Sequence, residues 1–147
     1  MMKKQKNDNL LTFYKSIHGN VALEYVSEGI SAGFPSPADD FKNERINLSE
    51  ELINDPNTTY YARVNGESMI GAGLDDNDLL VIDKSIPPKD GKIAVCCVDG
   101  EFTVKRLKIT DECVYLMPAN DNYKPIKVTK DKQLVIWGIV TYVIKKV

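Results

Sequence analysis

Histidine is almost missing from this chain of 147 residues, which contains only His18. That histidine lies in a polar segment near the N-terminus, so a serine–histidine–aspartate triad would require the segment to fold back onto the rest of the chain. A serine nucleophile would otherwise need a different base. The remaining option is a lysine that is kept neutral because it is removed from water.

Cysteine is also scarce. Cys96, Cys97 and Cys113 are odd in number, and the first two are neighbours on an expected strand, with side chains on opposite faces. The set fits neither a disulfide framework nor a zinc site. We therefore expect small apolar cysteines in a reducing cytoplasm.

The chain also has no excess of positive charge, because it contains 19 Lys and Arg residues and 21 Asp and Glu residues, for a net charge of −2. Direct sequence-specific DNA binding is therefore not expected. No apolar run approaches the length of a membrane span or of a signal-peptide core. The polar residues 75–78 lack the spacing, glycine and glutamate of a calcium loop, so neither a metal nor a cofactor is expected.

What is present is the composition of an ordinary globular protein, 43% hydrophobic and 27% charged, with the length of one domain. Strands are expected at residues 59–64, 79–83, 114–117 and 134–144. Asn47 can cap a short helix whose Leu48, Leu52 and Ile53 form an apolar stripe for the core. For residues 10–17, a short helix and disorder both remain open.

The first candidate functional residue is Ser68, which follows the turn dipeptide Asn65-Gly66. A serine just past such a turn can present its backbone N–H and its hydroxyl together, as a nucleophile with a local oxyanion donor requires. The same pattern is typical of a serine that only caps a short helix, so both interpretations stay open at this point.

The second candidate is Lys105, which lies in a β-hairpin predicted by the turn Asp99-Gly100. In the register of that hairpin, Lys105 lies opposite Ala94 and Thr103 lies opposite Cys96. These neighbours are small or apolar and offer no carboxylate, so they could strip water from the amine and lower its pKa. A solvated lysine on a strand edge is the alternative.

Several separate blocks, in order, resemble the LexA/UmuD family of self-cleaving serine–lysine peptidases, and the UmuD branch in particular. The blocks are residues 34–38, 66–69, 79–83, 98–100, 101–105 and 137–140. The family usually has aspartate where this chain has Glu67 and glycine where it has Asn77. Asparagine tolerates the same left-handed backbone as glycine, so the second difference puts little in doubt.

The resemblance implies a mainly β fold, a single compact LexA/signal-peptidase-like β domain with an extended N-terminal arm and one short helix. It assigns residues 1–40 to the arm, which contains the self-cleavage site, and residues 41–147 to the peptidase domain. The arm is too short for the winged helix-turn-helix domain of LexA-type repressors. That favours a UmuD-like protein.

The resemblance also implies a mechanism of self-cleavage. Ser68 would attack the carbonyl of Ala32, and neutral Lys105 would take the hydroxyl proton and deliver it to the leaving amine of Gly33. The backbone N–H groups of Glu67 and Ser68 would bind the oxyanion. The chain between Gly33 and Ser68 spans enough length, at about 3.3 Å per residue, for cleavage within one subunit, although cleavage between subunits stays open.

In its biological setting, such a protein would be a cytoplasmic homodimer whose self-cleavage is promoted by a RecA–single-strand DNA filament. The shortened form would be the accessory subunit of an error-prone UmuC-like translesion DNA polymerase in the SOS response to DNA damage. Two alternatives remain. One is a non-enzymatic β-domain interaction module, and the other is a phage-type repressor remnant that lacks its DNA-binding domain.

Overall fold

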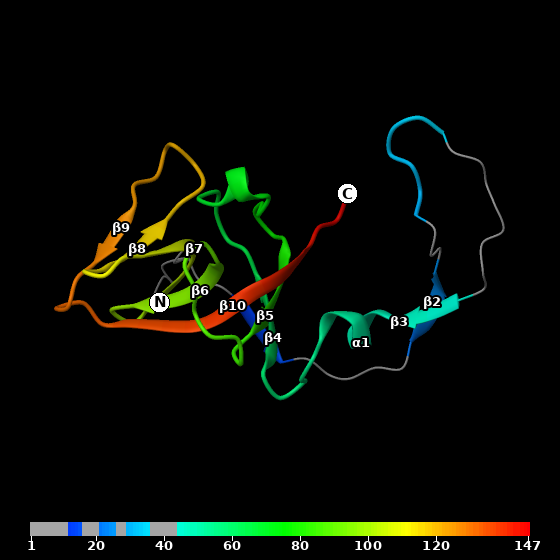
Figure 1. Cartoon of the computed structure of the whole chain (residues 1–147), viewed down its shortest axis with the longest axis horizontal. Coiled ribbons are helices and arrows are strands. Elements are labelled where there is room, and N and C mark those ends of the chain that lie inside the picture. The colour runs from blue at the N-terminus through cyan, green and yellow to red at the C-terminus, as the bar shows by residue number, and fades with distance from the viewer. Residues whose placement is uncertain (1–11, 16–20, 26–28, 36–43) are drawn as a thin grey trace, which may run out of the picture. The chain divides into compact units, whose positions relative to one another are not determined.

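The computed structural model describes residues 12–15, 21–25, 29–35 and 44–147 (Figure 1). These residues form two units. The larger unit combines the strand at residues 12–15 with residues 57–147, and the smaller unit lies within residues 17–56. His18 lies outside the described residues.

The larger unit is built on one eight-stranded sheet in the order β1-β4-β5-β10-β6-β7-β8-β9, in which neighbouring strands are antiparallel. The strands are β1 (Thr12–Lys15), β4 (Thr59–Arg63), β5 (Leu79–Asp83), β6 (Ile93–Val98), β7 (Glu101–Ile109), β8 (Val114–Met117), β9 (Ile126–Val128) and β10 (Leu134–Ile144). A short 3₁₀ helix, η1 (Ile70–Ala72), lies between β4 and β5.

Strand β10, the long red strand in Figure 1, pairs with β5 on one side and with β6 on the other. Its sequence is apolar on both faces, as is typical of a strand inside a sheet. Two irregularities in its pairing, between Ile136 and Gly138 and between Val140 and Tyr142, are β-bulges that bend the strand. The strand expected at residues 134–144 is present, although only Gly138 and Ile139 are buried and Val135, Tyr142 and Ile144 are exposed.

Two apolar clusters lie against this sheet, and successive residues of β6 alternate between them because strand side chains alternate in direction. One cluster consists of Ala62, Val64, Met69, Leu74, Leu80, Ile82, Val95 and Val104. The other consists of Ala94, Cys96, Leu107, Leu116, Val128 and Ile139. The sheet is therefore a rigid support for any side chain that it carries.

The β6–β7 hairpin forms as predicted. Asp99 and Gly100 both have positive φ, 48° and 84°, which is the requirement of the tight hairpin turn that the sequence indicated. Lys105 lies opposite Ala94, and Thr103 lies opposite Cys96. The predicted register is confirmed residue by residue.

In the smaller unit, β2 (Ala22–Tyr25) pairs antiparallel with β3 (Glu44–Asn47), and α1 (Leu48–Leu52) follows directly. The predicted cap is present, since the Asn47 side chain accepts a hydrogen bond from the Ser49 N–H. The apolar stripe is only partly confirmed. Ile53 is buried, whereas Leu48 is 56% exposed.

The N-terminal segment corrects one expectation. Residues 12–15 form strand β1 on β4, so neither a helix nor disorder describes them. Four residues carry too weak a local signal to predict a strand, and the pairing with β4 decides their conformation. The short strands β2, β3 and β9 were not expected either. The mainly β fold with one short α-helix is confirmed for the described part of the chain.

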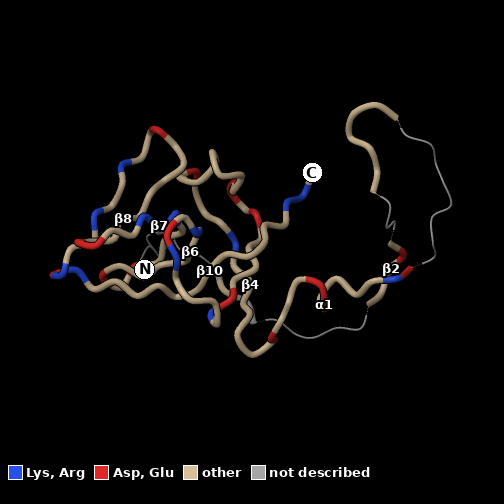
Figure 2. The backbone as a smooth tube through the Cα atoms, in the orientation of Figure 1, with Lys and Arg blue, Asp and Glu red and all other residues tan. Residues whose placement is uncertain are grey.

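Acidic and basic residues are interspersed along the chain of the larger unit, as Figure 2 shows. None of the helices among the described residues has the length and apolar character needed to cross a bilayer.

We expect that replacing Gly138, at the β-bulge of β10, lowers the stability of the protein. A Cβ added there would lie 2.5 Å from Cγ2 of Ile82, which is fully buried and cannot move aside cheaply. We expect Gly138→Ala to lower the free energy of unfolding by about 1–3 kcal/mol. Urea unfolding followed by far-UV circular dichroism measures the change.

The matched control is the same substitution in an Ile82→Ala background, where the clashing methyl is gone. Gly138→Ala should then cost less than it does in the parent protein. If the effects of Gly138→Ala and Ile82→Ala on the free energy of unfolding are additive to within about 0.5 kcal/mol, the proposed clash is contradicted.

Candidate active site

Ser68 lies in the connection between β4 and η1, just past the predicted turn. Gly66 has a φ of 98°, which only glycine adopts easily, and its N–H donates to the side chain of Asp76 at 2.7 Å. Ser68 is half-buried, and the next residue, Met69, is 2% exposed. The buried methionine anchors the segment in the core, and the serine remains at the surface of a cleft.

One side of this segment is held by the loop after β8. The Ala119 N–H donates to the carbonyl of Ser68 at 2.8 Å, and the Gly71 N–H donates to the carbonyl of Ala119 at 2.7 Å. Asn120 donates through Nδ2 to the carbonyl of Glu67 at 2.9 Å. A side chain at position 71 would collide with the Ala119 carbonyl, so the two segments can approach this closely only with glycine there.

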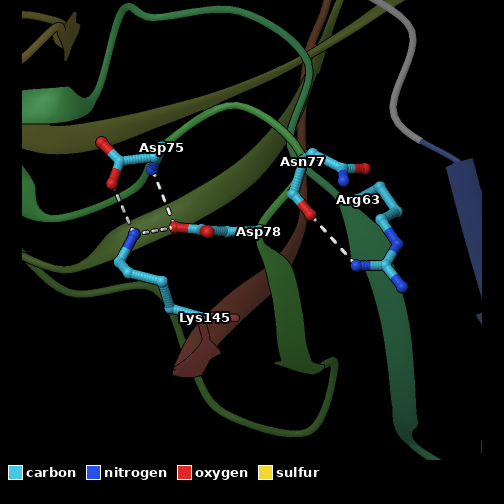
Figure 3. Close-up of polar contacts among 5 residues, drawn as sticks. All are labelled: Arg63, Asp75, Asn77, Asp78 and Lys145. Atoms are coloured by element: carbon cyan, nitrogen blue, oxygen red, sulfur yellow. Dashed lines mark hydrogen bonds and ion pairs between the residues drawn. The ribbon is translucent and has the colours of Figure 1, made fainter. Parts of the chain in front are cut away.

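The residues just before β5, among which Asp76 accepts from the Gly66 N–H, are themselves fixed by polar contacts (Figure 3). Lys145 forms ion pairs with Asp75 and Asp78, and Arg63 donates to the carbonyl of Asn77 at 3.0 Å. Burial would raise the pKa of Asp78, but hydrogen bonds from Lys145 and from the Asp75 N–H outweigh it and lower the pKa below its usual value. Asn77 has a φ of 70°, so it does adopt the left-handed backbone expected of it.

Lys105 reaches the Ser68 segment from β7. Its Nζ lies 2.8 Å from Oγ of Ser68, 2.8 Å from Oγ1 of Thr103 and 3.0 Å from the carbonyl oxygen of Val104. The residue is 7% exposed. The structure therefore brings together the two candidate side chains that the sequence separates by a whole hairpin.

Burial lowers the pKa of Lys105 below the usual range of a lysine, and the neighbouring Cys96 opposes this only in part. The pKa of the Cys96 thiol is itself raised to about 12, mainly by burial, so the thiol is neutral near pH 7 and supplies no negative charge. Within the described residues, no carboxylate forms an ion pair with Lys105. The environment thus favours the uncharged amine.

The contacts of the amine fit the neutral form. A neutral amine has two N–H donors and one lone pair, and Thr103 and the Val104 carbonyl can accept both donors. The lone pair is then left for the hydroxyl of Ser68. A charged ammonium could also donate to all three oxygens, and it is the burial without a counter-charge that disfavours it.

A cleft opens over these atoms. Its lining comes from residues 64–69, from residues 103–105 of β7, and from Tyr123, Lys124 and Ile126 near the start of β9. In the part of the chain that the structure describes, no group of His, Cys, Asp and Glu side chains is arranged to hold a metal ion.

The backbone N–H groups of Glu67 and Ser68 face no acceptor among the described residues, whereas both of their carbonyls are hydrogen-bonded. Such N–H groups are available to an incoming oxyanion. They belong to the two residues that the resemblance assigned to that role.

Ala32 and Gly33 belong to the smaller unit, and both are exposed. The backbone bends at residues 32–34, and the hydroxyl of Ser31 donates to the carbonyl of Phe34. The extended arm that the resemblance implies is therefore bent at this point.

Sequence reasoning missed the residues that hold the Ser68 segment, above all Asn120 and Asp76. Asn120 lies in a stretch of turn-forming residues that indicates a loop and nothing more. Its bond to Glu67 joins parts of the chain that are far apart, and no local pattern reports such a contact.

Comparisons with known proteins identify the family of the chain. A profile of the Peptidase S24-like family matches residues 24–141. The chain is 39% identical over 122 residues to Protein MucA of Salmonella typhimurium, covering 82% of this chain and 83% of MucA. It is 40% identical over 120 residues to Protein SamA of the same species, with the same coverage.

It is also 39% identical over 110 residues to the LexA repressor of Alcanivorax borkumensis, covering 75% of this chain but 53% of the repressor. The resemblance seen in the sequence blocks is confirmed, and it extends over most of the chain. This protein belongs to the S24-like peptidases, in the group that includes LexA and UmuD.

Proposed function

We propose that this protein is a UmuD-like serine peptidase that cuts its own chain between Ala32 and Gly33. The observation that carries the proposal is the 2.8 Å separation of the Ser68 hydroxyl from the amine of a buried Lys105. A serine nucleophile needs a base within hydrogen-bond reach, and a desolvated lysine is an effective one.

In the first step, the lone pair of Lys105 takes the proton of Ser68 as Oγ attacks the carbonyl carbon of Ala32. The carbonyl oxygen becomes an oxyanion, which accepts hydrogen bonds from the N–H groups of Glu67 and Ser68. The lysine is now charged at a buried position where no carboxylate of the described residues forms an ion pair with it. It therefore readily gives up the proton in the next step.

In the second step, the Lys105 ammonium protonates the amide nitrogen of Gly33, and the bond between Ala32 and Gly33 breaks. Residues 33–147 leave with a free amino group, and residues up to Ala32 remain as an ester on Ser68. Water then attacks the ester with Lys105 again as base, which regenerates the serine and releases a carboxylate.

The hydrogen bonds on both sides of the Ser68 segment have a clear role in this mechanism. An oxyanion site is useful only when its donors are fixed before the reaction. The bond from Asn120 holds the carbonyl of Glu67, which shares a planar peptide group with the Ser68 N–H and so orients that N–H. The bond from Ala119 holds the carbonyl of Ser68 and fixes the segment on its other side.

We further infer, from the UmuD branch of the family, that a RecA–single-strand DNA filament promotes the cut. A filament could act by opening the bend at residues 32–34 and stabilising the segment in the cleft. The shortened homodimer would then serve as the accessory subunit of a UmuC-like translesion polymerase in the SOS response.

Ser68→Ala and Lys105→Met should each leave a folded chain that no longer cuts itself, with a rate reduced by about 10³-fold or more. Wild-type protein at alkaline pH should yield a new N-terminus at Gly33, measured by intact mass spectrometry. Lys108→Ala, an exposed lysine on the same strand, is the control that should cut normally. Cleavage by the Ser68→Ala protein would refute the assignment.

Self-cleavage without a partner should accelerate as the pH rises. Only the neutral amine can accept the proton, and the neutral fraction of Lys105 grows until the pH passes its lowered pKa, above which the rate should level off. The rate is measured from mildly acidic to strongly alkaline pH. A rate that is constant over this whole range would argue against lysine as the base.

A further inference from the structure

Beside the cleft that contains Ser68 and Lys105, the larger unit has a second and more open groove, which we call the side groove. Its apolar lining comes from η1, from the end of β8 and from the loop that follows β8, and consists of Ile70, Met117, Pro118, Tyr123 and Pro125. Tyr123 lines both the cleft and the side groove, so the two adjoin.

Hydrogen bonds fix the side groove relative to the nucleophile. The Ala119 N–H donates to the carbonyl of Ser68 at 2.8 Å, and the Gly71 N–H donates to the carbonyl of Ala119 at 2.7 Å. The Tyr123 N–H donates to the carbonyl of Asn120 at 3.0 Å. A chain that binds in the side groove is therefore held at a defined position relative to the Ser68 hydroxyl.

The surface of the side groove is apolar and incompletely covered. Ile70 is 44% exposed and Tyr123 is 45% exposed. An aromatic ring near two prolines, here Pro118 and Pro125, is typical of surfaces that bind extended chains containing proline. Such surfaces recognise side chains and need no regular ladder of backbone hydrogen bonds.

The chain has a matching segment directly after the proposed cut, where Phe34 and Pro35 follow Gly33. Phe34 is 93% exposed, and Pro35 is exposed as well. Pro35 has no N–H, so it interrupts a ladder of hydrogen bonds, and it disfavours helical backbone at Phe34. Packing of these two side chains is therefore the main contact that this segment can offer.

The spacing of this segment from the scissile bond fits the position of the side groove. Phe34 lies two residues beyond Ala32, so in an extended chain their Cα atoms are about 7 Å apart. With the carbonyl of Ala32 at Ser68, the Phe34 ring is within reach of the cleft wall to which Tyr123 belongs. An anchor there fixes the register, because sliding by one residue would remove the ring from the groove.

We propose that the side groove binds Phe34 and Pro35 during self-cleavage, with the Phe34 ring against Tyr123. This inference rests on the proposed function and adds the contact that selects the bond to be cut. The groove recognises an aromatic residue followed by proline on the leaving side of that bond. A segment without the aromatic ring is held in the cleft less well and is cut more slowly.

The first test measures self-cleavage of the full-length chain at alkaline pH by intact mass spectrometry. Phe34→Ala and Tyr123→Ala should each slow the reaction about 10- to 100-fold, as expected for the loss of one buried aromatic contact. The double variant should be no slower than the slower single variant, because both changes remove the same contact. Tyr123→Phe keeps the ring and should cut at the parent rate.

The matched controls are Leu23→Ala and Ile109→Ala, at apolar residues that are 64% and 38% exposed and that line neither the cleft nor the side groove. Both should cut at the parent rate. A normal rate in the Phe34→Ala chain would overturn the proposal. So would effects of Phe34→Ala and Tyr123→Ala that multiply in the double variant, because the two residues would then act independently.

The second test measures binding without cleavage. The probe is a synthetic peptide with the sequence of residues 30–38, and the protein is the full-length Ser68→Ala/Phe34→Ala chain, which cannot cut and lacks the competing ring. Nuclear magnetic resonance of the methyl groups should show shifts at Ile70 and Met117 when the peptide is added. Shifts that leave both of these methyl groups unchanged would overturn the proposal.

Two further changes identify the contact. Adding Tyr123→Ala to the protein should abolish the shifts, and a peptide with alanine in place of Phe34 should bind at least about ten-fold more weakly. Equal binding by the alanine peptide would overturn the proposal. So would equally tight binding of a proline-rich peptide without an aromatic residue, because the groove would then suit a different protein.

The two tests separate this proposal from the proposed function. Wild-type protein that never cuts refutes the proposed function, and the peptide still decides whether the side groove binds this segment, since that experiment uses chains that cannot cut. Wild-type protein that cuts after Ala32 while the peptide leaves the groove unchanged refutes the present proposal alone.

Discussion

A buried amine that forms no ion pair with any described residue is the constraint on which this structure depends. Lys105 lies among small and apolar side chains, and its Nζ contacts two hydroxyls and one carbonyl. Burying a charged ammonium costs several kcal/mol, and burial therefore lowers the pKa of Lys105. A lowered pKa favours the neutral amine, which is the form that the proposed mechanism needs as a base beside Ser68.

The structure places Lys105 on a rigid sheet and Ser68 on a connection that a substrate can reach. The lysine stands on β7, inside a sheet whose central strand β10 is paired on both sides, and so its position is fixed by core packing. The serine lies on a connection, where backbone groups can face a substrate, and loops on two sides hold it in place. Among the described residues, β1 forms one edge of the same sheet.

The features that the sequence predicted came either from short local patterns or from the resemblance to a known family. The Asp99-Gly100 turn determines the register of its hairpin, and with it the neighbours of Lys105, because a two-residue turn leaves a single pairing. The contact between Lys105 and Ser68 came from the family resemblance, since no periodicity connects residues so far apart. Asn120 and β1 were missed for the same physical reason. A loop asparagine and a four-residue strand obtain their roles from partners that are distant in the chain.

The protonation state of Lys105 is the property that connects the fold with the proposed peptidase chemistry. Nuclear magnetic resonance titration of the labelled lysine amines, in the uncut Ser68→Ala protein, measures it without interference from cleavage. We predict a midpoint for Lys105 clearly below the value of about 10.4 for a free lysine side chain. A midpoint at or above that value would mean that the amine is charged at rest, which contradicts its role as the base.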